Sequence, residues 1–543
     1  MTLSYAHGGS DVPLLGETIG ENLKRTVGLH GDREALVVRS QGYRATYREL
    51  WEAVTEVALG LLALGIEKGE RVGVWSPNRY EWVVLQYATA RIGAILVNIN
   101  PAYKSNELGY VLNQAGIRTL ALAARFRHND YLAMLAEVRA NCPALRETIV
   151  FDTDWDTLRR KSAPPAALAA REATLQFDDP INIQYTSGTT GFPKGATLSH
   201  HNVLNNAYFI ARTLRYSERD RVCVPVPFYH CFGMVIGNLA CTATGACIVV
   251  PGEAFDPLLV LETVAGERCT SLYGVPMMFI AALDHPRFAE FDLGSLRTGV
   301  MAGSSCPIET MRAVQSKLGM REVTICYGMT ETSPVSVQSA VDDPLDKRVA
   351  TVGRVHPHLE IKIVDPKTGQ VVPRGDRGEL CTRGYSVMLG YWNDDAATRA
   401  AIDQARWMHT GDLATMDEAG YINIVGRIKD MIVRGGEKIY PRELEEFLMQ
   451  HPGIAEAHVI GVPSAKYGEE VMAWVRPKTG VTLAETELAA FCTGTIATYK
   501  IPRYWKITED FPMTVTGKIQ KFRMRELAIA ELGLEVAAAI QTA

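Results

Sequence analysis

The sequence predicts an α/β fold in two parts: a large, multi-lobed N-terminal domain built on parallel sheets, and a small α+β domain at the C-terminus. Helical stretches alternate with short apolar segments through the first three quarters of the chain. The length of 543 residues exceeds the size at which single cores usually stop growing. After Gly426 the composition changes, and a polar, charged turn follows. We therefore predict a division into residues 1–427 and 428–543.

The first predicted helix begins at a capping box. Thr46 and Glu49 are three residues apart, the spacing at which each side chain accepts a hydrogen bond from the other residue's backbone N–H. Apolar residues recur after them at helical spacing as far as Leu64. The next predicted elements are a strand, a helix and a strand over 71–75, 81–93 and 94–99, with further strands within 244–250 and 270–273. Strands that alternate with helices indicate a parallel sheet covered by helices.

One long segment carries no charged side chain. Residues 222–252 contain no Asp, Glu, Lys or Arg, which raises the question of a membrane span. Pro225, Pro227 and Asn238 interrupt its apolar character, as do the glycines and threonines between residues 237 and 245. We predict a buried helix and a strand here instead.

The C-terminal part has the pattern of a small mixed domain. Pro441 and Glu443 suit the first turn of a helix, where no N–H partner is needed and an acidic group faces the positive end of the helix dipole. Apolar runs over 457–462 and 471–475 predict strands. Roughly a hundred residues lie within the normal size of a domain.

The composition is that of a globular protein, with 47% hydrophobic and 22% charged residues. A formal charge of -5 and a pI near 6.2 favour neither nucleic acid nor an anionic membrane surface as a partner. The ten cysteines include no CxxC pair and no zinc-ligand spacing, so neither a zinc site nor a disulfide framework is expected. The first residues lack the basic start and apolar stretch of a secretory signal. Together these features predict a cytoplasmic protein without a transmembrane segment.

The strongest local motif is the segment YTSGTTGFPKG over residues 185–195. Its glycines let the backbone approach an anion closely, while amide and hydroxyl donors and Lys194 can neutralise a polyphosphate. It is not a Walker A loop, because Lys194 is followed by Gly195 rather than by Ser or Thr. We predict a phosphate-binding loop, and a polar surface turn is the alternative.

Five further motifs follow this loop in the chain. They are YGMTET at 327–332, YWN at 391–393, HTGD at 409–412, GRIKD at 426–430 and PMTVTGK at 512–518. With the loop, they resemble the motifs of the AMP-binding, adenylate-forming superfamily of acyl-CoA synthetases, peptide-synthetase adenylation domains and beetle luciferases. The resemblance runs from about Glu21 through Arg525 and is closest to medium-chain fatty acyl-CoA synthetases. It implies ATP, Mg²⁺ and coenzyme A as ligands, and a C-terminal domain that is mobile.

The resemblance implies a nucleotide site. Tyr327 would stack on adenine, Thr330 would contact the α-phosphate, and Glu331 would hold magnesium. Asp412 would accept hydrogen bonds from both ribose hydroxyls, with Arg427 assisting. The other residues implied to bind the nucleotide are Thr186, Ser187, Gly188, Thr189, Thr190, Gly191, Lys194, Gly303, Ser304 and Gly328.

Lys518 is implied to carry the adenylation step. Attack of a carboxylate on the α-phosphate of ATP forms a mixed anhydride, and the charge that accumulates between the reacting groups needs a fixed cation. Because Lys518 belongs to the small domain and the phosphate loop to the large one, the two must close on each other. The family then rotates the small domain about the residue matched by Lys429, so that a thiol channel forms.

Four residues are implied to bind coenzyme A. Gly435 and Gly436 would leave space for the slim pantetheine arm. Tyr467 matches a position that stacks on the adenine of coenzyme A in some relatives, and Lys500 would meet its phosphates. Ile501 departs from the pattern, because some relatives have arginine there.

The resemblance also implies where the acid binds. His230 matches the family histidine beside the carboxylate, where an imidazole can orient the acid without being the essential base; a structural core histidine is the alternative. Some long-chain relatives carry a gating tryptophan where this chain has Met234. The implied acyl pocket is apolar and has no matching cation, and its residues are Phe232, Val275, Met278, Gly303 and Met329. A medium-chain fatty acid is therefore predicted, with an aryl acid such as cinnamate or benzoate still open.

Three other functions share parts of this pattern. A fatty acyl-AMP ligase carries an extra insertion, and none is visible between Asp412 and Arg442. A luciferase-type oxidoreductase uses the same adenylation before it uses oxygen. A non-catalytic AMP-binding protein would need neither Lys518 nor Glu331, and both are present. The pattern leaves a monomer and a homodimer equally open.

Overall fold

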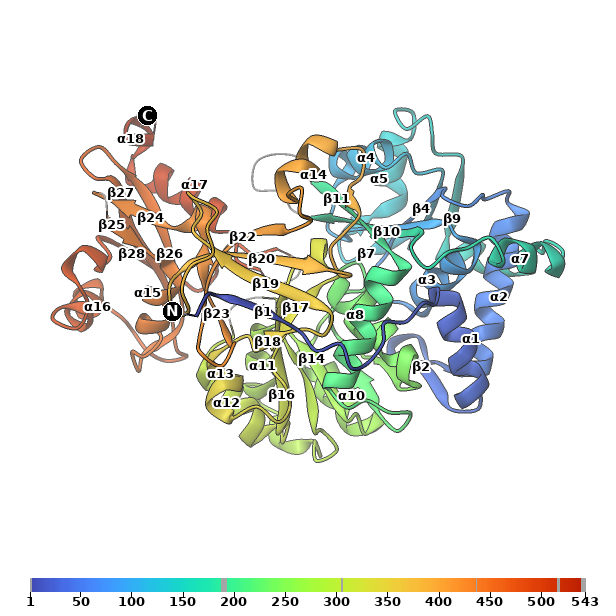
Figure 1. The fold of residues 1–543 in the computed structure, drawn as a ribbon, viewed down its shortest axis with the longest axis horizontal. Helices are drawn as coiled ribbons and strands as arrows, with labels where there is room; N and C mark the ends of the chain where they lie inside the picture. The colour runs from blue at the N-terminus through green and yellow to red at the C-terminus, as the bar shows by residue number, and fades with distance from the viewer. Residues whose placement is uncertain (1, 187–192, 304–305, 436, 515–517, 539–543) are drawn as a thin grey trace. The chain divides into compact units, whose positions relative to one another are not determined.

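The computed structural model describes residues 2–186, 193–303, 306–435, 437–514 and 518–538. They form two compact units, and Figure 1 labels their elements. The large unit comprises Ala6–Ile361 and Thr382–Met408; the small unit comprises Met1–Tyr5, Lys362–Cys381 and His409–Ala543. The divisions fall inside β1 (Tyr5–His7), β19 (Leu359–Val364), β20 (Gly378–Gly384) and β22 (Met408–Met416). The predicted boundary between residues 427 and 428 stays a prediction.

The first sheet of the large unit is mostly parallel, as the alternation of strands and helices predicts. Its seven strands run in the order β21-β11-β10-β5-β4-β6-β9. Neighbouring strands from β10 to β9 are parallel, whereas β11 pairs antiparallel with β10 and with β21. The bounds are β4 Arg71–Trp75, β5 Ile95–Ile99, β6 Thr119–Leu122, β9 Glu147–Val150, β10 Pro180–Thr186, β11 Lys194–Ser199 and β21 Gly390–Tyr391. The strands predicted over 71–75 and 94–99 are thus confirmed.

The second sheet of the large unit has nine strands in the order β18-β17-β16-β15-β14-β12-β13-β2-β3. Strands from β16 to β2 are parallel to their neighbours, and β17, β18 and β3 pair antiparallel. The bounds are β2 Glu34–Val38, β3 Tyr43–Thr46, β12 Arg221–Cys223, β13 Cys247–Val250, β14 Ser271–Gly274, β15 Thr298–Met301, β16 Glu322–Gly328, β17 Val335–Gln338 and β18 Arg354–Val355. The short, buried strands β13, β14 and β15 suit a parallel sheet whose two faces are covered.

The helices of the large unit lie between these strands in the chain. Figure 1 shows α1, α2 and α3 side by side, and their buried faces belong to one hydrophobic cluster. The bounds are α1 Ile19–His30, α2 Tyr47–Ala63, α3 Tyr80–Ile92, α4 Ser105–Gln114, α5 Tyr131–Arg139, α6 Phe151–Arg160, α7 Pro165–Glu172, α8 His200–Thr213, α9 Ala240–Thr244, α10 Pro257–Glu267, α11 Pro276–Leu283, α12 Ile308–Lys317, α13 Leu345–Ala350 and α14 Asp395–Ala401.

The capping box predicted for the first helix is present at the start of α2. Thr46 Oγ1 accepts from the Glu49 backbone N at 3.2 Å, and Glu49 Oε2 accepts from the Thr46 N at 2.7 Å. Such a cap contributes about 1 kcal/mol of stability.

Helix α3 is capped at its C-terminus by Gly93, whose φ of +68° lies in the left-handed region that favours glycine. The predicted helix over 81–93 is therefore confirmed, with its last residue acting as the cap.

The charge-free segment forms a buried helix and a strand, as predicted. A π-helix over Phe232–Leu239 continues into α9, and β13 follows. The sequence pattern predicts a helix here but not its π type. Gly233 explains part of the close packing, because a Cβ there would lie 2.4 Å from the Pro227 carbonyl oxygen. Buried amides stabilise the interior, since Asn238 Nδ2 donates to Gln86 Oε1 at 2.9 Å. Among the helices that the structure describes, none is both long and apolar enough to cross a bilayer.

The small unit contains a mixed sheet covered by helices. Its strands run in the order β25-β24-β27-β26, with β28 parallel to β27. Alternate side chains of β26 enter two clusters: Val459 packs in one, and Ile460 and Val462 pack with Trp474 in the other. The bounds are β1 Tyr5–His7, β23 Ile422–Arg427, β24 Ile432–Arg434, β25 Glu437–Ile439, β26 Ile454–Ser464, β27 Gly468–Pro477, β28 Tyr504–Ile507, α15 Pro441–Leu448, α16 Glu485–Cys492, α17 Lys521–Leu532 and α18 Glu535–Ala538. The predicted helix at Pro441 and the strands within 457–462 and 471–475 are confirmed.

Two buried histidines of the large unit are core residues. His200 Nδ1 accepts from the Ile19 N at 3.1 Å, and His356 Nε2 lies 2.8 Å from Gln338 Oε1. Among the described residues, His200 Nε2 and His356 Nδ1 have no hydrogen-bond partner. Burial lowers the pKa of each imidazole to about 3, so both rings are neutral in the folded protein.

These histidines predict a loss of stability in mild acid. In the unfolded chain both rings take up a proton below about pH 6.5, whereas in the folded protein they stay neutral down to about pH 3, so stability falls with pH across that window. At pH 5.5 the expected loss is about 1.4 kcal/mol for each ring. Thermal unfolding of the wild type and of a His200→Asn/His356→Gln variant, each at pH 7.5 and 5.5, measures the effect. The variant should show the smaller decrease in Tm, and equal decreases would contradict the prediction.

Candidate active site

The large unit gathers many of the predicted residues at one edge of its nine-stranded sheet. Because β12, β14, β15 and β16 are parallel, their carboxyl ends meet at the same edge. Ligands of open α/β sheets bind at this edge. The predicted residues that follow these strands are His230 and Phe232 after β12, Val275 after β14, Gly303 after β15, and Tyr327 and Gly328 at the end of β16.

The predicted phosphate loop connects two antiparallel strands. Thr186, the last residue of β10, pairs with Lys194, the first residue of β11, so the loop leaves and returns at one point. The predicted contacts of Ser187, Gly188, Thr189, Thr190 and Gly191 lie outside the described residues. The Lys194 ammonium lies 5.2 Å from the centre of the Tyr391 ring, a cation–π contact.

Glu331 joins this group through Tyr391. The Tyr391 hydroxyl donates a hydrogen bond to Glu331 Oε1 at 2.8 Å, and β21, which carries Tyr391, pairs directly with β11, which carries Lys194. Glu331 is only 5% exposed, and the preceding residue Thr330 is also buried. Burial, and then the neighbouring Glu331 carboxylate, raise the pKa of Tyr391. One place therefore holds a carboxylate that suits a divalent cation and an ammonium that suits a phosphate.

Tyr391 is a residue to which the sequence motifs assigned no role. It belongs to the YWN motif, which is the signal that points to it. Its contacts with Lys194 and Glu331 join residues that are far apart in the chain, so the motif alone does not reveal them.

The end of β16 requires glycine. A Cβ at Gly328 would lie 1.7 Å from the Pro334 carbonyl oxygen, closer than any real contact. Tyr327, the residue before it, is half-buried and pairs with Val337 of β17. Gly303 has a φ of +92°, which favours glycine, and the predicted contact of Ser304 lies outside the described residues.

The predicted acyl-pocket residues share one apolar region. The Phe232 ring lies 5.8 Å from that of Tyr273, and Phe232 and Val275 are buried in one cluster against which Met278 and Met329 pack. A Cβ at Gly303 would lie 3.1 Å from Val275 Cγ1, so the glycine also borders this region.

His230 is half-buried at the start of the π-helix segment. The Phe232 backbone N–H donates to His230 Nδ1 at 3.2 Å. In the neutral ring the proton therefore sits on Nε2, which is the nitrogen that can donate to an acid.

In the small unit, Asp412 pairs with Arg427 across β22 and β23. Arg427 Nε lies 3.2 Å from Asp412 Oδ1, and the aspartate side chain is 14% exposed. Lys429 follows in a 3-10 turn over Ile428–Asp430, and partial burial together with Arg427 lowers its pKa. The structure thus keeps the predicted ribose pair together.

Lys518 is bonded to Thr514 through its backbone. Its backbone N donates to Thr514 Oγ1 at 3.0 Å, and its carbonyl accepts from the Thr514 N at 2.7 Å. The Gln520 N also donates to the Pro512 carbonyl at 2.8 Å. These bonds use backbone atoms at position 518, so they do not depend on the lysine side chain.

The residues predicted to bind coenzyme A do not all contact one another. Gly435 donates its backbone N–H to the Tyr467 carbonyl at 2.9 Å, and Arg434 lies over the Tyr467 ring at 4.4 Å. Lys500 instead forms an ion pair with Glu443. The predicted contact of Gly436 lies outside the described residues.

A further polar group in the small unit was not predicted from the sequence. His409 Nδ1 lies 2.8 Å from Glu379 Oε2 and 3.5 Å from Cys381 Sγ. Hydrogen bonds to Cys381 and Glu379 raise the pKa of His409 to about 10. The three donor atoms lie within 4.8 Å of one another, but they already bond to each other and we assign them no metal. The ten cysteines, which all lie in described segments, form no disulfide.

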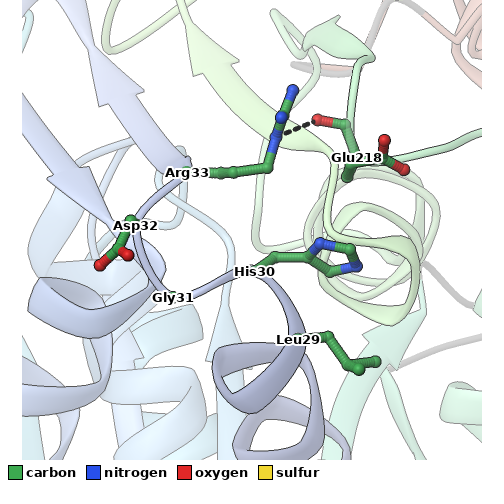
Figure 2. A pocket seen from close by; sticks show the side chains of 6 residues that line it. All are labelled: Leu29, His30, Gly31, Asp32, Arg33 and Glu218. Carbon is green, nitrogen blue, oxygen red and sulfur yellow. Dashed lines mark hydrogen bonds between the residues drawn. The ribbon is translucent and has the colours of Figure 1, made fainter.

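A pocket of about 390 Å³ lies elsewhere in the large unit. Figure 2 shows its lining residues Leu29, His30, Gly31, Asp32, Arg33 and Glu218. Arg33 Nε donates to the Glu218 carbonyl at 2.9 Å across it. It contains none of the predicted site residues and has no part in the proposed function.

Comparison with known proteins tests the resemblance. Residues 23–392 match the family model described as AMP-binding enzyme, and residues 443–518 match the model of the AMP-binding enzyme C-terminal domain. YngI of Bacillus subtilis, whose name assigns it provisionally to the acyl-CoA synthetases, is 47% identical over 96% of this chain and 99% of its own. The mitochondrial medium-chain acyl-CoA ligase ACSF2 of Danio rerio is 44% identical over 98% of this chain and 92% of its own.

Solved structures agree with this assignment. The anthranilate CoA ligase AuaEII in complex with anthranoyl-AMP has a TM-score of 0.86 at 28% identity, over 97% of this chain and 99% of its own. ATP-bound MatB from Rhodopseudomonas palustris has a TM-score of 0.82 at 30% identity, over 94% and 99%. The predicted family and the predicted α/β fold class are therefore confirmed, and this chain belongs to the family of AMP-binding enzymes.

Proposed function

We propose that the protein is an acyl-CoA synthetase, an ATP-dependent acid–thiol ligase that converts a medium-chain fatty acid to its acyl-CoA through an acyl-adenylate. The family and the names of its relatives support the reaction class. The observation that carries the proposal is the group of Lys194, Tyr391 and Glu331 beside the strands of the phosphate loop. This group combines an ammonium, which suits the phosphates of a nucleoside triphosphate, with a buried carboxylate, which suits its Mg²⁺.

The reaction has two half-reactions. In the first, a carboxylate oxygen of the acid attacks the α-phosphate of ATP, the bond to the β-phosphate oxygen breaks, and pyrophosphate leaves. In the second, the sulfur of coenzyme A attacks the acyl carbon and AMP leaves. We assign Lys518 to the charge that develops in the first half-reaction, because a fixed ammonium stabilises such charge without reorganisation.

The nucleotide is held by the predicted residues. Tyr327 stacks on adenine, Asp412 accepts from the ribose hydroxyls, and Thr330 contacts the α-phosphate. Glu331 is assigned to Mg²⁺, and its buried carboxylate is the ligand type that this ion prefers. Bound Mg²⁺ would offset the negative charge of the phosphates.

The substrate assignment rests on the acyl region. Phe232, Val275 and Met278 are apolar, and they favour an uncharged tail. The medium-chain ligase name of the ACSF2 relatives supports the same choice. We also propose that the protein is cytoplasmic. Its oligomeric state is tested separately, because size-exclusion chromatography distinguishes a monomer from a homodimer.

Acid preference tests the function directly. Purified protein is incubated with ATP, Mg²⁺ and acetate, octanoate, palmitate, benzoate or cinnamate, and AMP and pyrophosphate are measured with and without coenzyme A. Octanoate should give the highest kcat/KM. Each methylene buried against the apolar lining stabilises the bound acid by about 0.8 kcal/mol until the pocket is filled. AMP release should depend on the thiol.

Other outcomes of this assay would favour a different function. Pyrophosphate release without coenzyme A, and no stimulation by it, would indicate an adenylate-only enzyme. Light or oxygen uptake would favour the luciferase-type reaction. Preference for benzoate or cinnamate would replace the fatty acid by an aryl acid, and no AMP with any acid would contradict the ligase.

A further inference from the structure

The start of β22, which carries Asp412, is held by one carboxylate from another strand. Glu379 lies in β20, and its side chain is 12% exposed. Its Oε2 lies 2.8 Å from His409 Nδ1, and its Oε1 accepts from the Gly411 backbone N–H at 3.1 Å. Because a carboxylate only accepts, His409 Nδ1 carries the proton of this bond. The two oxygens of Glu379 therefore hold two of the three residues that precede Asp412.

Thr410, the third of these residues, is fixed as well. Thr410 Oγ1 donates to the Leu380 carbonyl at 2.7 Å and accepts from the Asp412 N at 3.1 Å. Gly411 has a φ of +71°, a backbone conformation in which a side chain would be strained. Bonds made by residues 379, 380 and 409–411 thus fix the backbone that carries Asp412, and Arg427 Nε lies 3.2 Å from the Asp412 carboxylate itself.

We infer that Glu379 is a positioning residue for Asp412, which fixes residues 409–411 of β22 so that the Asp412 carboxylate meets the ribose hydroxyls of the nucleotide. The inference rests on the proposed function, because the ribose contact is part of it. A carboxylate suits this task, since two N–H donors converge on it from His409 and Gly411. Glutamine at position 379 would keep the shape but offer one acceptor and one donor, so that one of the two N–H groups would lose its acceptor.

Ribose discrimination tests the inference. We propose to measure kcat/KM for ATP, 2′-deoxyATP and 3′-deoxyATP, with octanoate and coenzyme A, in the wild type, Glu379→Gln, Asp412→Asn and the double variant. Glu360→Gln is the matched control, because its carboxylate pairs with Arg383 at 2.7 Å, and Arg383 belongs to the same strand as Glu379. Tm values report whether each variant is folded.

The wild type should prefer ATP over each deoxynucleotide by about tenfold or more, the effect of losing a hydrogen bond to a charged group. Glu379→Gln should lower that preference several-fold and raise KM for ATP more than it changes kcat. Adding Asp412→Asn should lower the preference no further than Asp412→Asn alone, and Glu360→Gln should keep the wild-type ratio. A merely structural role would reduce activity with all three nucleotides equally.

The outcomes separate the two claims. If the wild type forms acyl-CoA and discriminates, but Glu379→Gln keeps the full preference, the inference alone is overturned. If the active wild type does not discriminate, Asp412 has no ribose contact to be positioned and the inference is also overturned. If the wild type forms neither acyl-adenylate nor acyl-CoA, the proposed function fails. Should Glu379→Gln not fold, His409→Leu removes one of the two bonds, and calorimetric binding of AMP against 2′-deoxyAMP gives the same comparison without catalysis.

Discussion

Lys518→Ala is expected to abolish acyl-adenylate formation while leaving the transfer of a supplied acyl-adenylate to coenzyme A close to the wild-type rate. The ammonium is assigned to the charge that develops as the carboxylate meets the α-phosphate, and removal of such a fixed group costs ~10²-fold or more in rate. Residue 518 bonds to Thr514 through its backbone atoms, so the alanine variant keeps these bonds.

The measurement separates the two half-reactions. Acid-dependent exchange of labelled pyrophosphate into ATP reports the first, and acyl-CoA formation from synthetic octanoyl-AMP reports the second. Lys478→Ala is the control, because Lys478 is an exposed lysine of the same small unit. Equal loss of both half-reactions in Lys518→Ala would contradict a lysine that serves only adenylation.

Glu331→Gln should lower kcat/KM for ATP by ~10²-fold, the usual order for loss of one electrostatic stabiliser. The amide keeps the shape and an oxygen that can accept from the Tyr391 hydroxyl, but it removes the charge that we assign to Mg²⁺. The Mg²⁺ concentration for half-maximal activity should therefore rise.

Tyr391→Phe is the matched control for this variant. It removes the hydroxyl that donates to Glu331 but keeps the carboxylate and the ring beneath Lys194. Its loss of activity should be smaller, and its Mg²⁺ requirement should change less than that of Glu331→Gln. A wild-type Mg²⁺ dependence in Glu331→Gln would contradict the metal assignment.

Local signals predicted the fold class and several of its helices and strands. The capping box of α2, the apolar periodicity of its buried face and the strands β4 and β5 were all readable, because each depends on residues close together in the chain. Element ends were less accurate: the strand predicted within 244–250 begins only at Cys247, because α9 continues through Thr244. The π-helix over Phe232–Leu239 had no sequence signal of its own.

The motifs named the candidate residues, but the contacts between them arise from tertiary packing. Motifs identify residues because glycine, hydroxyl, carboxylate and ammonium groups suit particular chemistry wherever the chain places them. The hydrogen bond from Tyr391 to Glu331 joins positions 60 residues apart, and those that Glu379 accepts from His409 and Gly411 span 30 and 32 residues.

The amino-acid sequence alone thus determined the family, the fold class and the candidate motifs for phosphate, adenine and the catalytic lysine. These features depend on residue type and local spacing. The partners of those residues depended on the folded chain: Tyr391 beside Glu331, Glu379 beside residues 409–411 of β22, and Lys500 with Glu443. The physical reason is that a hydrogen bond or ion pair is set by distance in space, and strand pairing brings together side chains that no local pattern connects.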